Sequence, residues 1–271
     1  MRANLPIGVF DSGVGGLTVL RALKAALPHE SFLYLGDTAR LPYGSKSPDT
    51  VARYALQAAA VLVERGIKLL VVACNTATAM ALPQLQAALP KFGVAGVIGV
   101  VEPGAQAACA ASKTRRIAVI GTEGTIRGGA YTRAITAIDP HVEVVGRACP
   151  LFVALAEEGW VQGPIPTAVA HAYLDTLVTH VDTLVLGCTH FPVLAEAIAE
   201  VVGPGVRIVD SAATTAVAVA SRLQQRDLLA PADAPATTTM LATDGRERFA
   251  RVGAGFLGVP LLPDAVEIID L

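Results

Sequence analysis

Two cysteines stand in closely similar sequence surroundings. Cys74 follows the apolar run LLVVA and Cys188 follows TLVLG, so each thiol comes directly after a predicted β-strand and before a predicted helix. The carboxyl ends of parallel strands are where α/β proteins bind ligands, and a helix N-terminus stabilises a thiolate. A structural cysteine has no need of polar neighbours, yet hydrogen-bonding residues follow both at once: Asn75, Thr76, Thr189 and His190. We therefore predict that Cys74 and Cys188 are functional.

The other two cysteines, Cys109 and Cys149, lack this setting, and we expect both to be structural. The four cysteines form no CxxC pair, so the sequence does not support a zinc ribbon or a thioredoxin-like site.

A glycine-rich segment, DSGVGG at residues 11–16, follows the first predicted strand and opens a helix. Such a turn could bind an anion through its backbone N–H groups, but it matches neither GxGxxG nor the P-loop. Asp37, at the end of the next strand, keeps nucleotide binding open as an alternative. The carboxylate of Asp11 would repel a phosphate and would suit a ligand with an ammonium group. Asp11 and Ser12 could also cap the helix.

Three further polar positions have ordinary interpretations when they are taken alone. The segment LPYG at residues 41–44 predicts a turn, and the pair Glu157 and Glu158 would lie on a solvated helix face. His190 follows Cys188 by only two residues, so we expect it to be poorly placed as the base for that thiol. It could still tune the charge of the thiol or hold a carboxylate.

Short apolar runs alternate with Ala- and Leu-rich helical segments, which predicts an α/β fold with parallel sheets. The predicted strands are Ile7–Phe10, Phe32–Leu35, Leu69–Ala73, Val97–Val100, Ile117–Ile120, Val142–Val145, Leu184–Leu186 and Arg207–Val209. The predicted helices include Leu17–Leu27, Pro48–Arg65, Tyr131–Ile138, Ile165–His180, Val193–Val201 and Arg246–Val252, the last ended by Gly253.

The two cysteine segments belong to an internal repeat. The strand before Asp11 resembles the strand before Thr122 at nearly the same offset and in the same order, which predicts two similar α/β halves. We predict one domain over residues 1–98, with 211–271 packing back on it, and a second over 99–210. If the halves face each other across a cleft, two thiols flank one bound molecule. Such a pair can remove a proton from one face of a carbon and return one on the other, without a metal or cofactor.

The segments IGVFDSGVGGL, LPYG, ACNTATA, GCTHFP and TDGRERFARVGAGFLG, taken together and in this order, resemble the bacterial glutamate racemase family of the aspartate/glutamate racemase superfamily. The resemblance runs from about residue 7 to residue 258. It implies two α/β domains with the active site between them, cofactor-independent interconversion of L- and D-glutamate, and supply of D-glutamate for peptidoglycan. It also implies a homodimer.

The resemblance assigns roles to individual positions. Cys74 and Cys188 would be the acid/base thiols, the first for the α-proton of D-glutamate and the second for that of L-glutamate. Asp11 and His190 would assist these thiols, and Asp37 and Glu157 (or Glu158) would give electrostatic support. Substrate would be bound by Asp11, Ser12, Tyr43, Gly44, Asn75, Thr76, Thr122, Thr189 and His190.

Composition limits the other possibilities. The 271 residues are 53% hydrophobic and carry a formal net charge of −2, which gives no general attraction to nucleic acid or to anionic membranes. No apolar run approaches the roughly 20 residues of a membrane span, and the N-terminus resembles no signal peptide. We expect a cytoplasmic enzyme. The alternatives are a racemase or isomerase of another acid such as aspartate, and a non-catalytic amino-acid- or nucleotide-binding protein, which would need no matched thiols.

Overall fold

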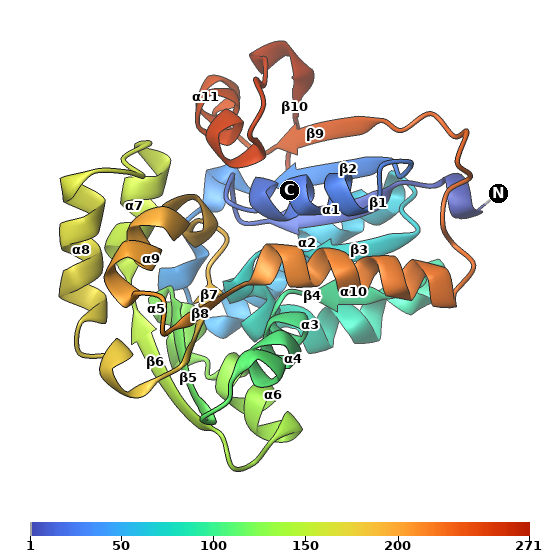
Figure 1. The fold of residues 1–271 in the computed structure, drawn as a ribbon. Coiled ribbons are helices and arrows are strands. Elements are labelled where there is room, and N and C mark those ends of the chain that lie inside the picture. The colour runs from blue at the N-terminus through green and yellow to red at the C-terminus, as the bar shows by residue number, and fades with distance from the viewer. Residues whose placement is uncertain (1) are drawn as a thin grey trace.

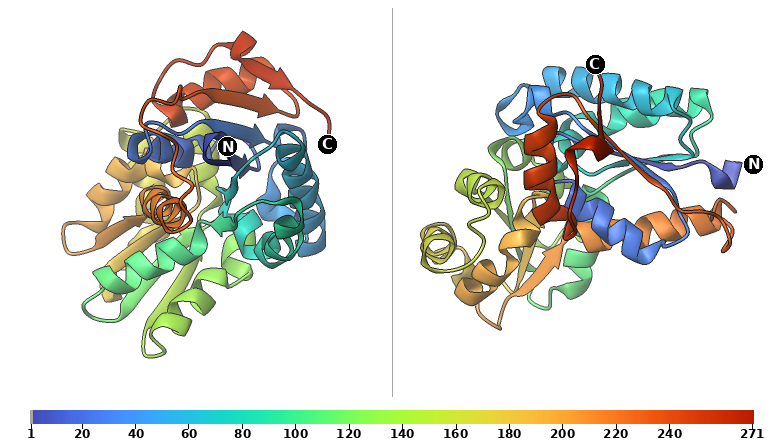
Figure 2. Two further views of the ribbon diagram at one scale, coloured as in Figure 1. Left: turned by 90° about the vertical axis from the view of Figure 1, so that its right-hand side faces the viewer. Right: turned by 90° about the horizontal axis from the view of Figure 1, so that it is seen from above.

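The computed structural model describes residues 2–271, which form two parallel β-sheets with helices packed around them (Figures 1 and 2). The first sheet has the strand order β10-β9-β2-β1-β3-β4, and the second has the order β6-β5-β7-β8. The strands of the first sheet are β1 (Ile7–Asp11), β2 (Phe32–Gly36), β3 (Leu69–Val72), β4 (Val97–Gly99), β9 (Thr238–Ala242) and β10 (Val266–Ile268). Those of the second are β5 (Arg116–Gly121), β6 (Glu143–Ala148), β7 (Thr183–Gly187) and β8 (Arg207–Asp210).

The two sheets repeat one arrangement. The order β2-β1-β3-β4 in the first sheet matches β6-β5-β7-β8 in the second, strand for strand along the chain. All the strand pairs are parallel, so the carboxyl ends of the strands lie at one edge of each sheet. The prediction of an α/β fold with two similar halves is therefore confirmed.

Helices connect the strands, as parallel pairing requires. They are α1 (Leu17–Ala26), α2 (Pro48–Glu64), α3 (Asn75–Ala88), α4 (Val101–Ala111), α5 (Glu123–Arg127), α6 (Ala130–Ile138), α7 (Pro150–Glu157), α8 (Pro164–Leu174), α9 (Ala195–Val202), α10 (Ser211–Gln225) and α11 (Arg246–Leu257). Short 3-10 turns complete the connections, among them Thr38–Arg40, Tyr43–Ser45 and Phe191–Leu194. Of the helices described, none is both long and apolar enough to cross a lipid bilayer.

The eight predicted strands are all present, and two strands were missed. The central strands β1, β3 and β7 are buried along their whole length, which explains their continuous apolar sequences. The missed β9 begins with two threonines after a proline-rich loop, and the missed β10 has only three residues. Neither has the apolar run that marks a buried strand.

Two predicted helix ends were wrong. The helix predicted over Ile165–His180 ends at Leu174, and a short 3-10 turn follows. Gly253 does not end α11, which continues to Leu257 and is capped by Gly258 in the left-handed region at φ 79°. Gly253 has another reason to be glycine, because a Cβ there would lie 2.7 Å from the side chain of Leu17 on α1.

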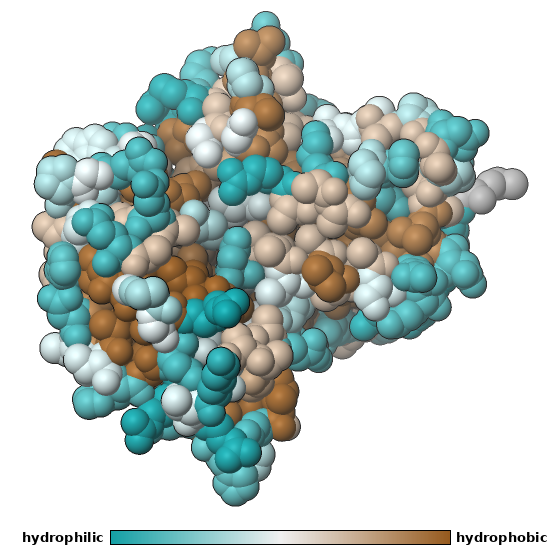
Figure 3. Space-filling model, in the orientation of Figure 1, coloured by the Kyte–Doolittle hydropathy of each residue, from teal (hydrophilic) through white to brown (hydrophobic). Residues whose placement is uncertain are grey.

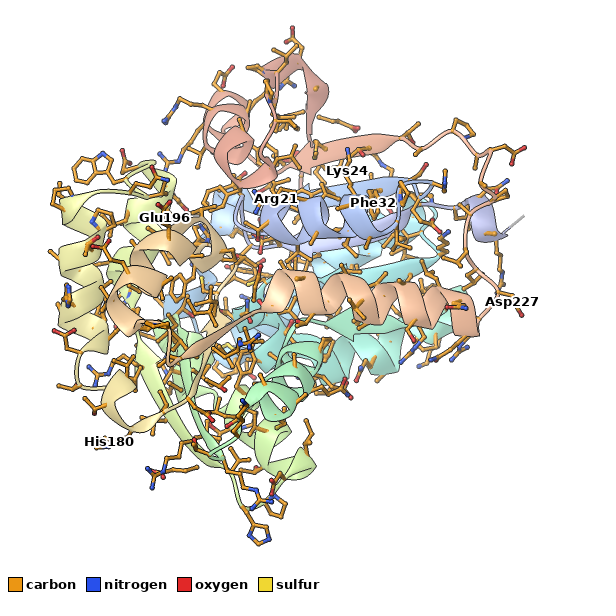
Figure 4. All side chains as sticks on the ribbon, in the orientation of Figure 1. Arg21, Lys24, Phe32, His180, Glu196 and Asp227 are labelled. Carbon is orange, nitrogen blue, oxygen red and sulfur yellow. The ribbon has the colours of Figure 1, made fainter. Side chains whose placement is uncertain are left out.

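The C-terminal segment packs on the first sheet. Lys24 on α1, labelled in Figure 4, donates a hydrogen bond to Thr238 at the start of β9. The linker before β9 is held by a buried ion pair between Lys68 and Glu30, in which Lys68 donates to the carbonyl of Leu228 and Glu30 accepts from the N–H of Ala230. Removing one member of such a buried pair costs about 3–5 kcal/mol. The first sheet is thus completed by the last part of the chain.

Figure 3 shows polar and apolar residues mixed over this face, with strongly apolar residues gathered around α9 and β8. Val201 of α9, Ile208 of β8 and Val206 between them are partly buried and pack against the core. This apolar area therefore continues the core of the molecule outward.

Candidate active site

A cavity of about 490 Å³ is lined by residues that follow strands of both sheets. The loops that form it follow the carboxyl ends of the central strands, where the sequence predicted the site. Eleven of the predicted site residues line it: Ser12, Tyr43, Gly44, Cys74, Asn75, Thr76, Thr122, Glu157, Cys188, Thr189 and His190. The structure thus brings together segments from six separate parts of the chain.

Cys74 lies at the N-terminus of α3, as predicted. Its Sγ accepts a hydrogen bond from the N–H of Ala77 at 3.4 Å and donates one to Ser12 Oγ at 3.5 Å. Burial, followed by the negative charge of Asp11, raises the pKa of Cys74 to about 12. At neutral pH this sulfur is therefore a thiol.

Asp11 is completely buried and does not line the cavity. Its Oδ2 accepts a hydrogen bond from the N–H of Gly13 at 2.9 Å, and burial raises the pKa of its carboxyl. Its Oδ1 has no hydrogen-bond partner among residues 2–271. The alternative of a helix cap was wrong, because α1 begins at Leu17 and its N-cap residue is Gly16.

Cys188 has a different environment. It follows β7 but is not at a helix N-terminus, because a 3-10 turn over Phe191–Leu194 comes before α9. That turn brings the ring of His190 back toward the thiol, with Nδ1 at 3.8 Å from Sγ. The short sequence separation thus does not keep the ring away from the thiol, and His190 is close enough to tune the charge of the sulfur, which is one of the roles that the sequence left open.

His190 is held as a cation beside Cys188. Burial alone lowers the pKa of an imidazole, but here hydrogen bonds to Cys188 and Glu157, together with their negative charges, raise the pKa of His190 to about 10. An imidazolium next to a sulfur stabilises negative charge on it. The charged neighbour of Cys188 is therefore a cation, whereas that of Cys74 is the carboxylate of Asp11.

Glu157, and not Glu158, is the acidic residue of this group. Its Oε1 lies 3.1 Å from His190 Nε2, and its Oε2 accepts a hydrogen bond from Arg248 of α11 at 2.7 Å. The hydrogen bond to His190 is the main cause of its lowered pKa, and Arg248 adds to it. The interpretation of Glu157 as part of a solvated helix face was wrong, because its side chain is only 17% exposed.

The two halves touch directly around His190. Thr18 on α1 donates a hydrogen bond to the carbonyl of Thr189 at 3.0 Å. Gly15 lies against the same residues, and a Cβ at this position would collide with the side chains of Thr189 and His190. One glycine of the DSGVGG segment is thus explained by close packing across the site.

Asp37 supports the site from behind. Its side chain is buried, does not line the cavity, and accepts hydrogen bonds from Arg40, Tyr43 and Thr243. These contacts hold the turn that brings Tyr43 and Gly44 to the cavity. Both carboxylate oxygens of Asp37 are used in them, so Asp37 does not contact a ligand in the cavity. This placement removes the reason for assigning Asp37 to a nucleotide ribose.

Hydroxyl and amide groups from both halves meet on one side of the cavity. Thr76, Thr122 and Thr125 form a cluster in which the hydroxyl oxygens lie 2.9–3.2 Å apart. Asn75 Oδ1 accepts a hydrogen bond from Tyr131, while its buried Nδ2 has no partner among residues 2–271. These are hydrogen-bond donors suited to a carboxylate.

Cys149 corrects one part of the sequence analysis. It comes directly after β6 and before α7, the setting that was predicted only for Cys74 and Cys188. It is nevertheless fully buried in the core and does not line the cavity, and burial raises its pKa to about 12. Cys109 lies on α4, away from the cavity. A strand end alone therefore does not identify a functional thiol.

Several residues around the site were missed. Glu123, Pro150, Val153 and Ala154 line the cavity, while Thr125, Tyr131 and Arg248 contact its lining residues. Only Arg248 had a signal in the sequence, since it lies in the late TDGRER segment. Among residues 2–271, no group of three or more His, Cys, Asp or Glu side chains could hold a metal ion.

Comparison with known proteins places the chain in a family. The family model of Asp/Glu/Hydantoin racemase matches residues 7–219. Glutamate racemase of Geobacter metallireducens is 54% identical over 253 residues, which are 93% of this chain and 92% of that protein. Two crystal structures of glutamate racemases cover 99% of this chain and 98% of theirs: that from Thermus thermophilus with β-chloro-D-alanine (TM-score 0.88, 43% identity) and that from Francisella tularensis with D-glutamate (0.89, 35%). This chain therefore belongs to the Asp/Glu/Hydantoin racemase family, among its glutamate racemases, and is an isomerase.

Proposed function

We propose that this protein interconverts L- and D-glutamate by a two-base mechanism in which Cys74 and Cys188 exchange protons with the α-carbon. The observation that carries the proposal is that two thiols line one cavity next to groups of opposite charge. Cys188 lies beside the cation of His190, and Cys74 lies near the carboxylate of Asp11. The membership of the chain among glutamate racemases supports glutamate as the substrate.

In the proposed reaction of L-glutamate, Cys188 starts as the thiolate and Cys74 as the thiol. The thiolate of Cys188 takes the α-proton, so the C–H bond breaks and an S–H bond forms. The thiol of Cys74 gives its proton to the opposite face of the resulting carbanion, which forms D-glutamate and leaves Cys74 as the thiolate. The reverse reaction begins from that second state, with the two thiols in exchanged roles.

The α-proton of an amino acid is a very weak acid, so the carbanion needs preorganised stabilisation. We propose that the α-carboxylate is held by the Nδ2 of Asn75 and by hydroxyls of the threonine cluster, and that Ser12, Tyr43, Gly44 and Thr189 complete the binding site. No Lys or Arg is among the described residues that line the cavity, and the ring nitrogens of His190 face Glu157 and Cys188, so neutral donors are left to bind the two carboxylates. Asp11 then acts mainly through its charge on Cys74.

The remaining expectations extend this proposal. We propose that the protein works in the cytoplasm as a homodimer and that its D-glutamate is used for peptidoglycan. We also propose residues 1–98 with 211–271, and residues 99–210, as its two domains. The sheets described above support that division, because the first sheet contains strands from both ends of the chain and the second only strands between them.

The first experiment follows α-proton exchange in D₂O. Purified, reduced protein is incubated with L-glutamate without added cofactor or metal. Proton NMR is expected to show loss of the α-proton, and circular dichroism is expected to show loss of optical activity. A parallel sample with L-aspartate tests the substrate. Exchange of aspartate in place of glutamate would assign the same chemistry to another acid, and exchange of neither would contradict the racemase proposal.

Cysteine variants test the two-thiol mechanism itself. Cys74→Ala and Cys188→Ala are each expected to abolish racemisation, a loss of at least about a thousandfold, because each removes one of two required bases. Cys149→Ala is the matched control, since it removes a thiol at an equivalent strand end that does not line the cavity. Racemisation retained in Cys188→Ala would exclude the mechanism.

A further inference from the structure

We infer that α11, the helix of the C-terminal segment, positions the catalytic imidazole: Arg248 holds Glu157, Glu157 holds His190, and His190 faces Cys188. Arg248 is on this assignment a positioning residue for the thiol of the opposite half. The inference rests on the proposed two-thiol racemisation and adds a residue outside the 7–219 segment that the family model matches.

The contacts form one continuous chain. Arg248 donates to Glu157 Oε2 at 2.7 Å, Glu157 Oε1 lies 3.1 Å from His190 Nε2, and His190 Nδ1 lies 3.8 Å from Cys188 Sγ. The Glu157 carboxylate therefore has one oxygen on each neighbour. The bond from Arg248 fixes the rotation of the carboxylate, and the carboxylate in turn fixes the plane of the ring.

A second residue of α11 touches the same ring. Phe256 packs its edge against His190, with ring centroids 5.1 Å apart and an interplanar angle of 74°. Phe256 and Arg248 thus act on His190 from one helix, the first by direct contact and the second through Glu157. These two contacts of α11 together restrict the orientation of the imidazole ring of His190.

The helix that provides this support is anchored in the other half of the molecule. Phe249 of α11 packs on Tyr34 of β2, with ring centroids 6.0 Å apart, and Gly253 lies against Leu17 of α1. Glu157, His190 and Cys188 all belong to the segment that contains the second sheet. The support of Cys188 therefore crosses from the first sheet to the second.

The test uses Arg248→Met, which removes the charge and the hydrogen bond but keeps the length of the side chain. Arg251→Met is the matched control, because Arg251 is an exposed arginine of the same helix that does not contact Glu157. We expect Arg248→Met to lower kcat about tenfold and to leave KM within about twofold, since Arg248 does not line the cavity. Arg248→Lys, which restores a cation, is expected to recover part of kcat.

A second readout is independent of turnover. Iodoacetamide reacts with thiolates, and mass spectrometry measures the alkylation rate of each cysteine separately. A loosened His190 stabilises the Cys188 thiolate less, so alkylation of Cys188 in Arg248→Met is expected to slow several-fold (about three- to tenfold) relative to Cys74 in the same sample. A purely structural defect would do the opposite, because a loosened fold exposes all four thiols and speeds their alkylation.

The outcomes separate this inference from the proposed function. Unchanged kcat and unchanged Cys188 alkylation in Arg248→Met, or equal losses in Arg251→Met, would overturn the role of Arg248. Wild-type protein that exchanges no α-proton would overturn the racemase proposal. In that case slower Cys188 alkylation in Arg248→Met would still support the positioning of His190 by α11, and unchanged alkylation would reject it.

Discussion

The two thiols occupy equivalent strand ends of a repeated arrangement, yet their surroundings differ in charge. Cys74 caps α3 and lies near the buried carboxylate of Asp11, which opposes its ionisation. Cys188 lacks a helix N-terminus and lies beside the cation of His190. The repeat in the sequence thus places two similar groups, and the residues around them give the two sulfurs neighbours of opposite charge.

The equal stability of the two enantiomers limits how this difference between the thiols can appear in the kinetics of the proposed reaction. The equilibrium constant between enantiomers is one, so kcat/KM must be equal in the two directions whatever the surroundings of the thiols. The asymmetry can therefore appear only in kcat and KM taken individually, and in the reactivity of the two sulfurs. Experiments that separate the two sulfurs are the most direct way to test the comparison.

Of the experiments that compare the surroundings of the two sulfurs, His190→Asn is expected to have the largest effect. The change removes the cation beside Cys188, so kcat is expected to fall about a hundredfold. Alkylation of Cys188 by iodoacetamide is expected to slow, while alkylation of Cys74 changes little. His171→Asn, at an exposed histidine of α8 paired with Asp175, is the control and is expected to have wild-type rates. Equal slowing of both thiols would contradict the assigned asymmetry.

A smaller and opposite effect is expected at the other thiol from Asp11→Asn. Removing the negative charge lowers the pKa of Cys74 from about 12, although burial still keeps it above its ordinary value. Alkylation of Cys74 at pH 9 is expected to become about tenfold faster, as a shift of one pKa unit would give. Cys188 in the same sample is the internal control, and no acceleration at Cys74 would show that burial alone sets its state.

The smallest effect concerns the pH dependence of stability. The pKa of His190 is about 10 in the folded protein against 6.5 ordinarily, so the folded state binds this proton more tightly. Its contribution to the free energy of unfolding is fully present below about pH 6.5 and is lost as the pH rises through about 10. The difference in urea stability between wild type and His190→Asn is therefore expected to shrink from pH 6.5 to pH 10. A difference that grows would reverse the assigned charge of His190.

The sequence was sufficient for the parts of the molecule that depend on local pattern. Short apolar runs predicted eight of the strands, and the strand–cysteine–polar pattern predicted Cys74, Cys188 and their neighbours. A repeat of strand and turn also predicted two similar halves. These features are local because each strand of a parallel sheet covered on both faces has its own apolar signature.

Features that depend on long-range contacts were not predicted. The position of His190 follows from a 3-10 turn that only the packed structure defines, and the role of Arg248 depends on α11 returning to the other half. The strand β9 has a weak apolar pattern, and it is held by its neighbours β2 and β10. Cys149 is the reverse case. It follows a strand and precedes a helix, as a functional thiol was expected to do, but its side chain is buried in the core and does not line the cavity.

The path of the chain has a consequence for how the protein matures during synthesis. Every strand of the second sheet lies between residues 116 and 210, so that sheet can form while the chain is still growing on the ribosome. The first sheet lacks β9 and β10 until residues 238–268 have been synthesised, and α11 with Arg248 and Phe256 is made at the same stage. Cys188 is thus made well before this helix, so the contacts of α11 with Glu157 and His190 can form only after the helix has emerged from the ribosome.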